Sequence, residues 1–144
     1  MMLDADAIRA LLTESHTIAV VGLSTKPERP SYDVAKYLQL HGYRIVPVNP
    51  MHAGEHILGE YCHATLTQAA AALKSAGARI DIVDCFRKSE HVAPVVDEAI
   101  AVGARCVWMQ LGVIDHDAAA KAQGAGLIVV MDKCIKIEHA FVTR

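Results

Sequence analysis

Short apolar runs that alternate with helix-periodic segments most constrain the fold of this chain. Residues 17–22 form a continuous, largely β-branched run closed by glycine, which is typical of a buried strand. Similar runs follow, and the segments between them carry apolar residues at helical spacing, several of them closed by glycine. The predicted strands are 17–22, 45–48, 80–83, 106–109 and 127–131; the predicted helices are 3–12, 31–41, 67–76, 94–102, 115–122 and 133–140; and 52–66 is irregular, with room for a small hairpin.

Strand, helix and strand repeated in this way require right-handed crossovers and a parallel sheet. We therefore expect an α/β protein with a Rossmann-like three-layer fold and a five-stranded parallel sheet in the order 3-2-1-4-5. A length of 144 residues, 53% of them hydrophobic, predicts one buried core and a single domain over 1–144. Pro47 lies inside the second strand and cannot donate to a ladder, so it marks a bulge or the strand's end.

Charge and cysteine content narrow the partners and the compartment. A net charge of −2 gives no electrostatic reason to expect nucleic acid or an anionic membrane as partner. The four cysteines contain no C-x-x-C pair, so they predict free thiols in a reducing compartment, the cytoplasm. Asp4, Asp6 and Arg9 interrupt the apolar residues of segment 1–13, which is therefore neither a signal peptide nor a membrane span.

The loop after the first strand has the parts of a phosphate site. Gly22 allows close backbone approach, Ser24 and Thr25 supply hydroxyl groups, and the next helix offers unsatisfied N–H groups. Lys26 and Arg29 add positive charge, and the guanidinium can bind phosphate in a bidentate fork. A solvated charged loop with one structural glycine is the alternative interpretation.

The other strands end in residues that would reach the same edge of the sheet. Ligands of such folds bind outside the carboxyl ends of the strands, where the strand order reverses. Arg87 and Lys88 follow the third strand, and Gln110 follows the fourth. Phe86 can flank a flat ring there, although a single phenylalanine after a strand is also typical of a core.

Two common nucleotide motifs are absent. A dinucleotide fingerprint would need glycines where Ser24 and Pro27 stand, and an acidic residue where Asn49 follows the second strand. No Walker A loop occurs either. These absences count against NAD and ATP as ligands.

Metal and catalytic signals are weak. His52 and His56 have the i, i+4 spacing of a metal pair, but Gly54 between them argues against a helix, so we expect no metal site. Cys85 and Cys134 follow strands, where small buried cysteines are ordinary. No spacing of Ser, His and Asp indicates a hydrolase elbow. We expect no catalytic constellation.

Taken in order, five segments resemble the CoA-binding protein family: small stand-alone proteins similar to the CoA-binding domain of the succinyl-CoA synthetase α subunit. The resemblance covers nearly the whole chain. The segments are Ile18-Ala19-Val20-Val21-Gly22-Leu23-Ser24, Tyr43-Arg44-Ile45-Val46-Pro47-Val48-Asn49-Pro50, Asp81-Ile82-Val83-Asp84-Cys85-Phe86-Arg87, Val107-Trp108-Met109-Gln110-Leu111-Gly112 and Val130-Met131-Asp132-Lys133-Cys134-Ile135-Lys136-Ile137-Glu138-His139.

The resemblance implies a site for coenzyme A, or for an acyl-CoA, at the strand ends. By analogy, the loop after the first strand meets the nucleotide phosphates, the end of the second strand lies along the ligand, and the later loops complete the pocket. The predicted site consists of Gly22, Leu23, Ser24, Lys26, Arg29 and Ser31, of Val48, Asn49 and Pro50, and of Phe86, Arg87 and Gln110.

Three functions remain open at this stage. The first is a CoA or acyl-CoA binding module that acts as sensor, carrier or regulator. The synthetase also needs a domain with a phosphorylated histidine and a partner subunit, so we expect binding without ligation. The second is a Rossmann-fold enzyme or sensor that uses NAD(P) or another nucleotide. The third is an interaction protein whose pocket is a relic; protein partners stay undefined.

Overall fold

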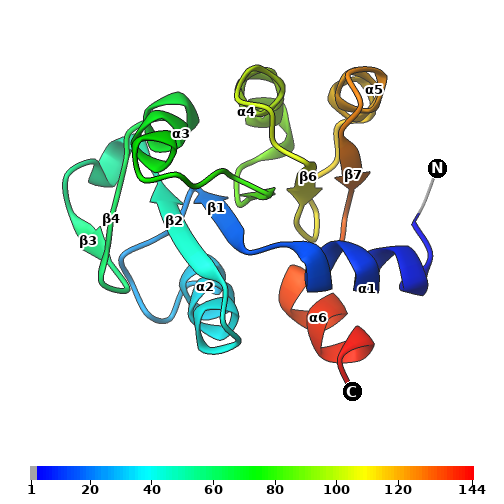
Figure 1. Cartoon of the computed structure of the whole chain (residues 1–144), viewed down its shortest axis with the longest axis horizontal. Helices are drawn as coiled ribbons and strands as arrows, with labels where there is room; N and C mark the ends of the chain where they lie inside the picture. Colours follow the sequence, from blue (N-terminus) through cyan, green and yellow to red (C-terminus); the bar gives the residue numbers. More distant parts are fainter. Residues whose placement is uncertain (1–2) are drawn as a thin grey trace.

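The computed structural model describes residues 3–144; Met1 and Met2, with which the predicted domain begins, lie outside the described residues. At its centre is a five-stranded parallel sheet in the order β2-β1-β5-β6-β7 (Figure 1). The predicted α/β, Rossmann-like fold with five parallel strands is confirmed. The strands are β1 (Thr17–Val21), β2 (Arg44–Val48), β5 (Ile82–Cys85), β6 (Cys106–Met109) and β7 (Ile128–Val130).

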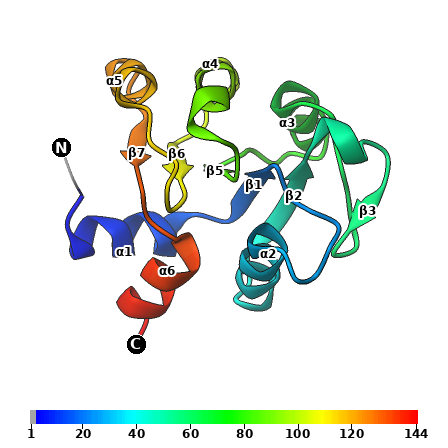
Figure 2. The same ribbon diagram turned by 180° about the vertical axis from the view of Figure 1, so that it is seen from behind.

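Helices cover both faces of this sheet. Figures 1 and 2 show α3, α4 and α5 on one face and α1, α2 and α6 on the other. Within residues 3–144, no helix has the length and apolar character needed to cross a bilayer. The helices are α1 (Ala5–Glu14), α2 (Pro30–Leu40), α3 (Leu66–Ser75), α4 (Val92–Ala101), α5 (His116–Gly124) and α6 (Ile135–Val142), with 3-10 turns η1 (Pro50–His52) and η2 (Ser89–His91).

The irregular segment after β2 contains the small hairpin. Strand β3 (His56–Ile57) pairs antiparallel with β4 (Glu60–Tyr61). A single parallel bridge from Val48 to His63 attaches the end of this segment to the outer side of β2.

The strand order corrects the sequence-based prediction. Numbered along the chain, the five strands lie in the order 2-1-3-4-5 and not 3-2-1-4-5, because β5 pairs with β1 and leaves β2 at the edge. Pro47 supplies a physical reason. Its carbonyl faces away from β1 and accepts the N–H of His63 at 3.1 Å, so its ring nitrogen also faces the outer edge. In a central strand the same nitrogen would leave a neighbouring carbonyl without a donor.

The corrected order moves the point at which the chain reverses direction across the sheet. From β1 the chain passes through α2 to β2, and then returns past β1 through α3 to β5. The loops after β1 and β5 therefore diverge to opposite faces and leave a crevice between them, which is where doubly wound sheets bind ligands. The expected order would have put the reversal between β1 and β6.

Both faces of the sheet are apolar, which explains why the strands read as continuous apolar runs. Ala19 and Val21 pack into the core on the side of α3, α4 and α5. Ile18 and Val20 pack into the core on the side of α1, α2 and α6, together with Trp108.

Candidate functional site

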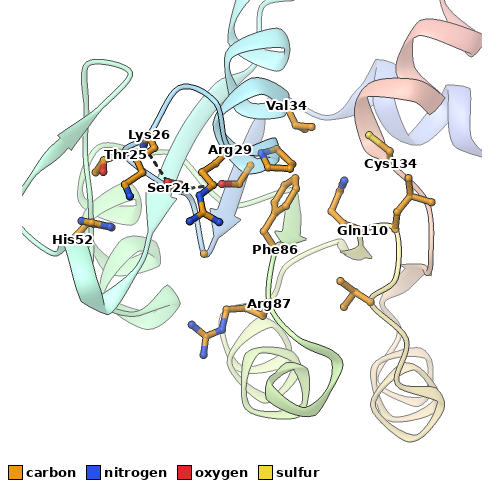
Figure 3. Close-up of a pocket in the computed structure, with 15 residues that line it drawn as sticks. Ser24, Thr25, Lys26, Arg29, Val34, His52, Phe86, Arg87, Gln110 and Cys134 are labelled. Atoms are coloured by element: carbon orange, nitrogen blue, oxygen red, sulfur yellow. Dashed lines mark hydrogen bonds between the residues drawn. The ribbon is translucent and has the colours of Figure 1, made fainter.

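A cavity of about 720 Å³ lies at the carboxyl ends of β1, β5 and β6 (Figure 3). Sites for small molecules and cofactors typically enclose roughly 300–1,000 Å³, so the volume suits such a ligand. The lining comes from the loop after β1, the start of α2, η1, the loops after β5 and β6, and the residue before α6. These residues are Gly22, Ser24, Thr25, Lys26, Arg29, Pro30, Ser31, Val34, His52, Phe86, Arg87, Gln110, Leu111, Val113 and Cys134.

Gly22 makes the turn at the base of the cavity. Its φ is +89°, and its N–H donates to the carbonyl of Val48 at 2.8 Å. A Cβ atom at this position would lie 2.3 Å from the backbone oxygen of Phe86. Only glycine allows the loops after β1 and β5 to approach so closely.

Two serine hydroxyl groups, one in the loop after β1 and one in α2, hold this loop in shape. The Ser31 hydroxyl accepts the N–H of Ser24 at 3.0 Å, and the Ser24 hydroxyl accepts the N–H of Lys26 at 3.0 Å. Helix α2 begins with Pro30, and its N-cap residue Arg29 makes no side-chain capping bond. The first N–H groups of α2 therefore have no side-chain acceptor from the cap, a state in which helix N-termini bind anions.

Three cations line the cavity together with this helix start. Figure 3 shows the charged ends of Lys26, Arg29 and Arg87 on the same side of Phe86. Among the described residues, none of the three forms an ion pair, whereas Lys136 on α6 pairs with Asp33 at 2.8 Å. A chain of net charge −2 thus places three cations that lack an ion pair within residues 3–144 in the lining of one cavity.

Four residues of the predicted site do not line the cavity. Leu23 and Val48 are fully buried in the two cores, and Pro50 is exposed at the start of η1. Asn49 is buried and links two loops: its Nδ2 donates to the Leu23 carbonyl at 3.0 Å, and its Oδ1 accepts the N–H of Met51 at 2.9 Å. This asparagine holds the turn that presents His52 against the loop after β1.

The cavity continues past Phe86 to an end of different character. Figure 3 shows Gln110 and Cys134 on the side of Phe86 opposite the cations. Val34, Leu111 and Val113 contribute apolar surface to the lining. The cavity thus joins a cationic end to an end marked by the uncharged side chains of Gln110 and Cys134.

Cys134 was not identified from the sequence as a site residue. The expectation that it is an ordinary buried cysteine is wrong, because Cys134 is partly exposed and lines the cavity. Its position directly after a strand and before a helix start is the signal that could have identified it. Cys85, by contrast, is fully buried, and burial raises the pKa of its thiol far above the ordinary range.

The two histidines with metal-pair spacing do not face a common ligand position. His52 Nδ1 lies 2.9 Å from a carboxylate oxygen of Glu55, and the ring of His56 packs edge-on against Tyr61. Within residues 3–144, no group of three or more His, Cys, Asp or Glu side chains is arranged to hold a metal ion.

A buried carboxyl group lies one row below the cavity. Asp84 is paired across the sheet with Val20 of β1 and Trp108 of β6, and it is completely inaccessible. Neither carboxyl oxygen has a hydrogen-bond partner among the described residues. Burial raises the pKa of Asp84 well above its usual range, so the protonated form is favoured.

Comparison with known structures shows the same fold in both similar and distant proteins. A hypothetical protein from Pyrococcus horikoshii OT3 is 37% identical, with a TM-score of 0.88 over 99% of this chain and 94% of that one. A Rex-family repressor, RSP, in complex with β-NADH is 16% identical, with a TM-score of 0.57 over 88% of this chain and 58% of that one. The repressor shares the fold alone.

Comparison of sequences gives the family. The uncharacterized protein YneT from Bacillus subtilis (strain 168) is 39% identical over 133 residues, which is 92% of each chain. The family described as CoA binding domain matches residues 16–140, a span that includes the whole sheet and the cavity. The chain belongs to this family of CoA-binding domains.

Proposed function

We propose that the chain is a single-domain module that binds coenzyme A, or a CoA thioester, in the cavity at the β1–β5 crevice. The observation that carries this proposal is that Lys26, Arg29 and Arg87, which form no ion pair within residues 3–144, line the same cavity as the start of α2. Membership of the CoA-binding family supports it. We further propose that the module senses, carries or regulates without turning the ligand over, as the resemblance to one domain of the synthetase implies.

The charge of the ligand matches this end of the cavity. CoA carries a diphosphate and a 3′-phosphate, and the protein as a whole is slightly acidic, so the complementary charge has to be local. Charge-assisted hydrogen bonds from guanidinium groups to phosphate are short and frequently bidentate. The N–H groups at the start of α2 and the hydroxyl groups of Ser24 and Thr25 supply further donors.

The remaining predicted residues are proposed either to contact the rest of the ligand or to hold the loops around it. Phe86 and Gln110 line the cavity beyond the cations and are proposed to flank the pantetheine arm. Leu23, Val48 and Asn49 lie beneath the loops and are proposed to fix their shape. Pro50 belongs to the same turn as His52, which lines the wall.

The cysteines support a reducing compartment, for which we propose the cytoplasm. All four are free thiols, and Cys62, Cys85 and Cys106 are buried at separate places in the core. A protein that matures in an oxidising compartment typically pairs its cysteines.

A nicotinamide nucleotide is the alternative ligand. The fold shared with a Rex-family repressor that binds β-NADH favours it. Against it stands Asn49, which occupies the place of the acidic residue that binds the ribose hydroxyls in NAD sites and is already bonded to Leu23. The effects of CoA and NAD on the melting temperature distinguish the two proposals.

CoA is expected to raise the melting temperature, and NAD at the same concentration is expected to raise it far less. At a free concentration of 100 Kd the ligand contributes about 2.7 kcal/mol of stability, a shift of roughly 5–10 °C for a domain of this size. Differential scanning fluorimetry under reducing conditions measures both shifts. A larger shift with NAD than with CoA contradicts the proposal.

Arg29→Ala and Arg87→Ala are each expected to weaken CoA binding about tenfold or more. The loss of one charge-assisted contact to phosphate costs roughly 1.5–3 kcal/mol. Isothermal titration measures the change in Kd. Arg44→Ala is the matched control, since Arg44 is exposed at the amino end of β2, away from the cavity. Unchanged CoA affinity in both cavity variants would place the phosphates elsewhere.

A further inference from the structure

Cys134 is the one accessible thiol among the chain's cysteines. Cys62, Cys85 and Cys106 are each 0% exposed, whereas Cys134 lines the cavity. It occupies the N-cap position of α6, where its side chain makes no capping hydrogen bond. Lys136 on α6 pairs with Asp33 on α2 at 2.8 Å, so the helix that follows Cys134 lies beside the helix whose start carries Arg29.

A second observation at this end of the cavity points to a ligand. Gln110 is only 5% exposed, yet it lines the cavity. Its Oε1 accepts the N–H of Ile135 at 3.2 Å, which fixes the orientation of the amide next to Cys134. The Nε2 group has no acceptor within residues 3–144, and Figure 3 shows the side chains of Gln110 and Cys134 on the same side of Phe86. This amide donor is open to the cavity, where a ligand can supply its acceptor in place of water.

The pantetheine arm of CoA suits both groups. It carries amide carbonyls, which accept hydrogen bonds, and it ends in a thiol. With the phosphates at Lys26, Arg29 and Arg87, the arm extends past Phe86 toward Gln110 and Cys134. A carbonyl bound to Gln110 Nε2 brings the end of the arm to the Cys134 sulfur.

On the basis of the proposed function, we propose that Cys134 captures CoA covalently as a mixed disulfide, by exchange with CoA disulfide. The Cys134 thiol releases its proton to solvent, and the thiolate attacks one sulfur of CoA disulfide. The bond between Cys134 and that sulfur forms while the original sulfur–sulfur bond breaks. The second CoA leaves as a thiolate and takes up a proton, so the number of disulfide bonds is unchanged.

The mixed disulfide is expected to persist, because no second thiol can resolve it within the described structure. Cys85 and Cys106 are fully buried in the sheet, and burial raises the pKa of both thiols far above the ordinary range. Cys62 is buried beside Asn49 and does not line the cavity. An external reductant is therefore needed to release the bound CoA, so the modification of Cys134 responds to the redox state of the CoA pool.

The experiment treats the reduced full chain, after removal of reductant, with CoA disulfide, and in parallel with oxidised glutathione at equal concentration. Intact-mass spectrometry without reductant is expected to find one CoA per chain, on Cys134, removable by dithiothreitol. Modification by CoA disulfide is expected to be about tenfold faster or more, because its phosphates bind the cations. Arg87→Ala is expected to lower that rate toward the glutathione rate.

Two serine substitutions locate the reaction. Cys134→Ser is expected to abolish the adduct, and Cys62→Ser is expected to leave it unchanged. The covalent proposal is overturned if the reduced chain binds CoA in isothermal titration but acquires no adduct, or acquires it no faster than the glutathione adduct. An absence of CoA binding to the reduced chain instead overturns the proposed function, and the covalent capture with it.

Discussion

Gly22→Ala is expected to lower the melting temperature by roughly 5–15 °C, which corresponds to a loss of about 2–4 kcal/mol in the free energy of unfolding. Two costs add. An L residue at a φ of +89° is strained, and the new Cβ would meet the Phe86 carbonyl oxygen at 2.3 Å. The backbone cannot rotate away without breaking the bond from the Gly22 N–H to Val48. Thermal unfolding followed by circular dichroism measures the change.

Gly42→Ala is the matched control for this substitution. Gly42 has a similar φ of +93°, but a Cβ there meets nothing within 4 Å. It therefore carries the backbone strain without the clash, and we expect a loss of only about 1 kcal/mol. The difference between the two variants measures the close approach of the loops after β1 and β5. Equal losses would contradict that interpretation.

The secondary structure could be predicted from the sequence because periodicity and glycine placement act locally. The strand 106–109 has the predicted bounds, and the small hairpin lies within the predicted segment. The strand order could not be obtained from the same local patterns, because any order with right-handed crossovers satisfies them. Pro47 was informative about the order: a proline inside a strand run indicates an edge strand, and of the orders 3-2-1-4-5 and 2-1-3-4-5 only the second puts β2 at the edge.

The cationic end of the candidate site could be predicted because it lies in one continuous loop that follows a strand. Ser24, Lys26 and Arg29 were identified in this way, and the structure places all three in the cavity lining. The other end is assembled from separate segments, so no local pattern contains it. Cys134 reaches the cavity because α6 folds back beside α2, which is a tertiary contact.

Asp84 was missed for a different reason, an error of two residues in a strand boundary. The strand predicted over 80–83 would place Asp84 beyond its end, where an acidic side chain is solvated. The observed strand is Ile82–Cys85, and Asp84 lies inside the sheet between Val20 and Trp108. A shift of this size converts an ordinary loop carboxylate into a buried group that has no hydrogen-bond partner within residues 3–144.

Asp84→Asn is expected to stabilise the protein relative to the parent, by an amount that increases with pH. Because burial raises the pKa of Asp84, the folded protein retains a proton that the unfolded chain releases above a pH of about 3.9. The parent therefore loses stability as the pH rises from that value to the folded-state pKa, by about 1.4 kcal/mol for each pH unit. Asparagine has nearly the same shape and does not titrate, so the variant escapes this loss.

Urea unfolding of both proteins between pH 4.5 and 8 measures the difference in the free energy of unfolding. The test is the slope of that difference with pH, because an unpaired amide in the same position adds a cost that is independent of pH. Asp117→Asn is the control, since Asp117 is exposed on α5 and makes no ion pair in the described part of the chain, and its difference is expected to stay within about 0.5 kcal/mol.

A difference for Asp84→Asn that does not change with pH would mean that Asp84 does not titrate abnormally. A difference that becomes less favourable to the variant as pH rises would mean that the ionised carboxylate is stabilised in the fold. With the expected slope, the row beneath the cavity contains a neutral acid, and the cations above it remain free to bind an anionic ligand.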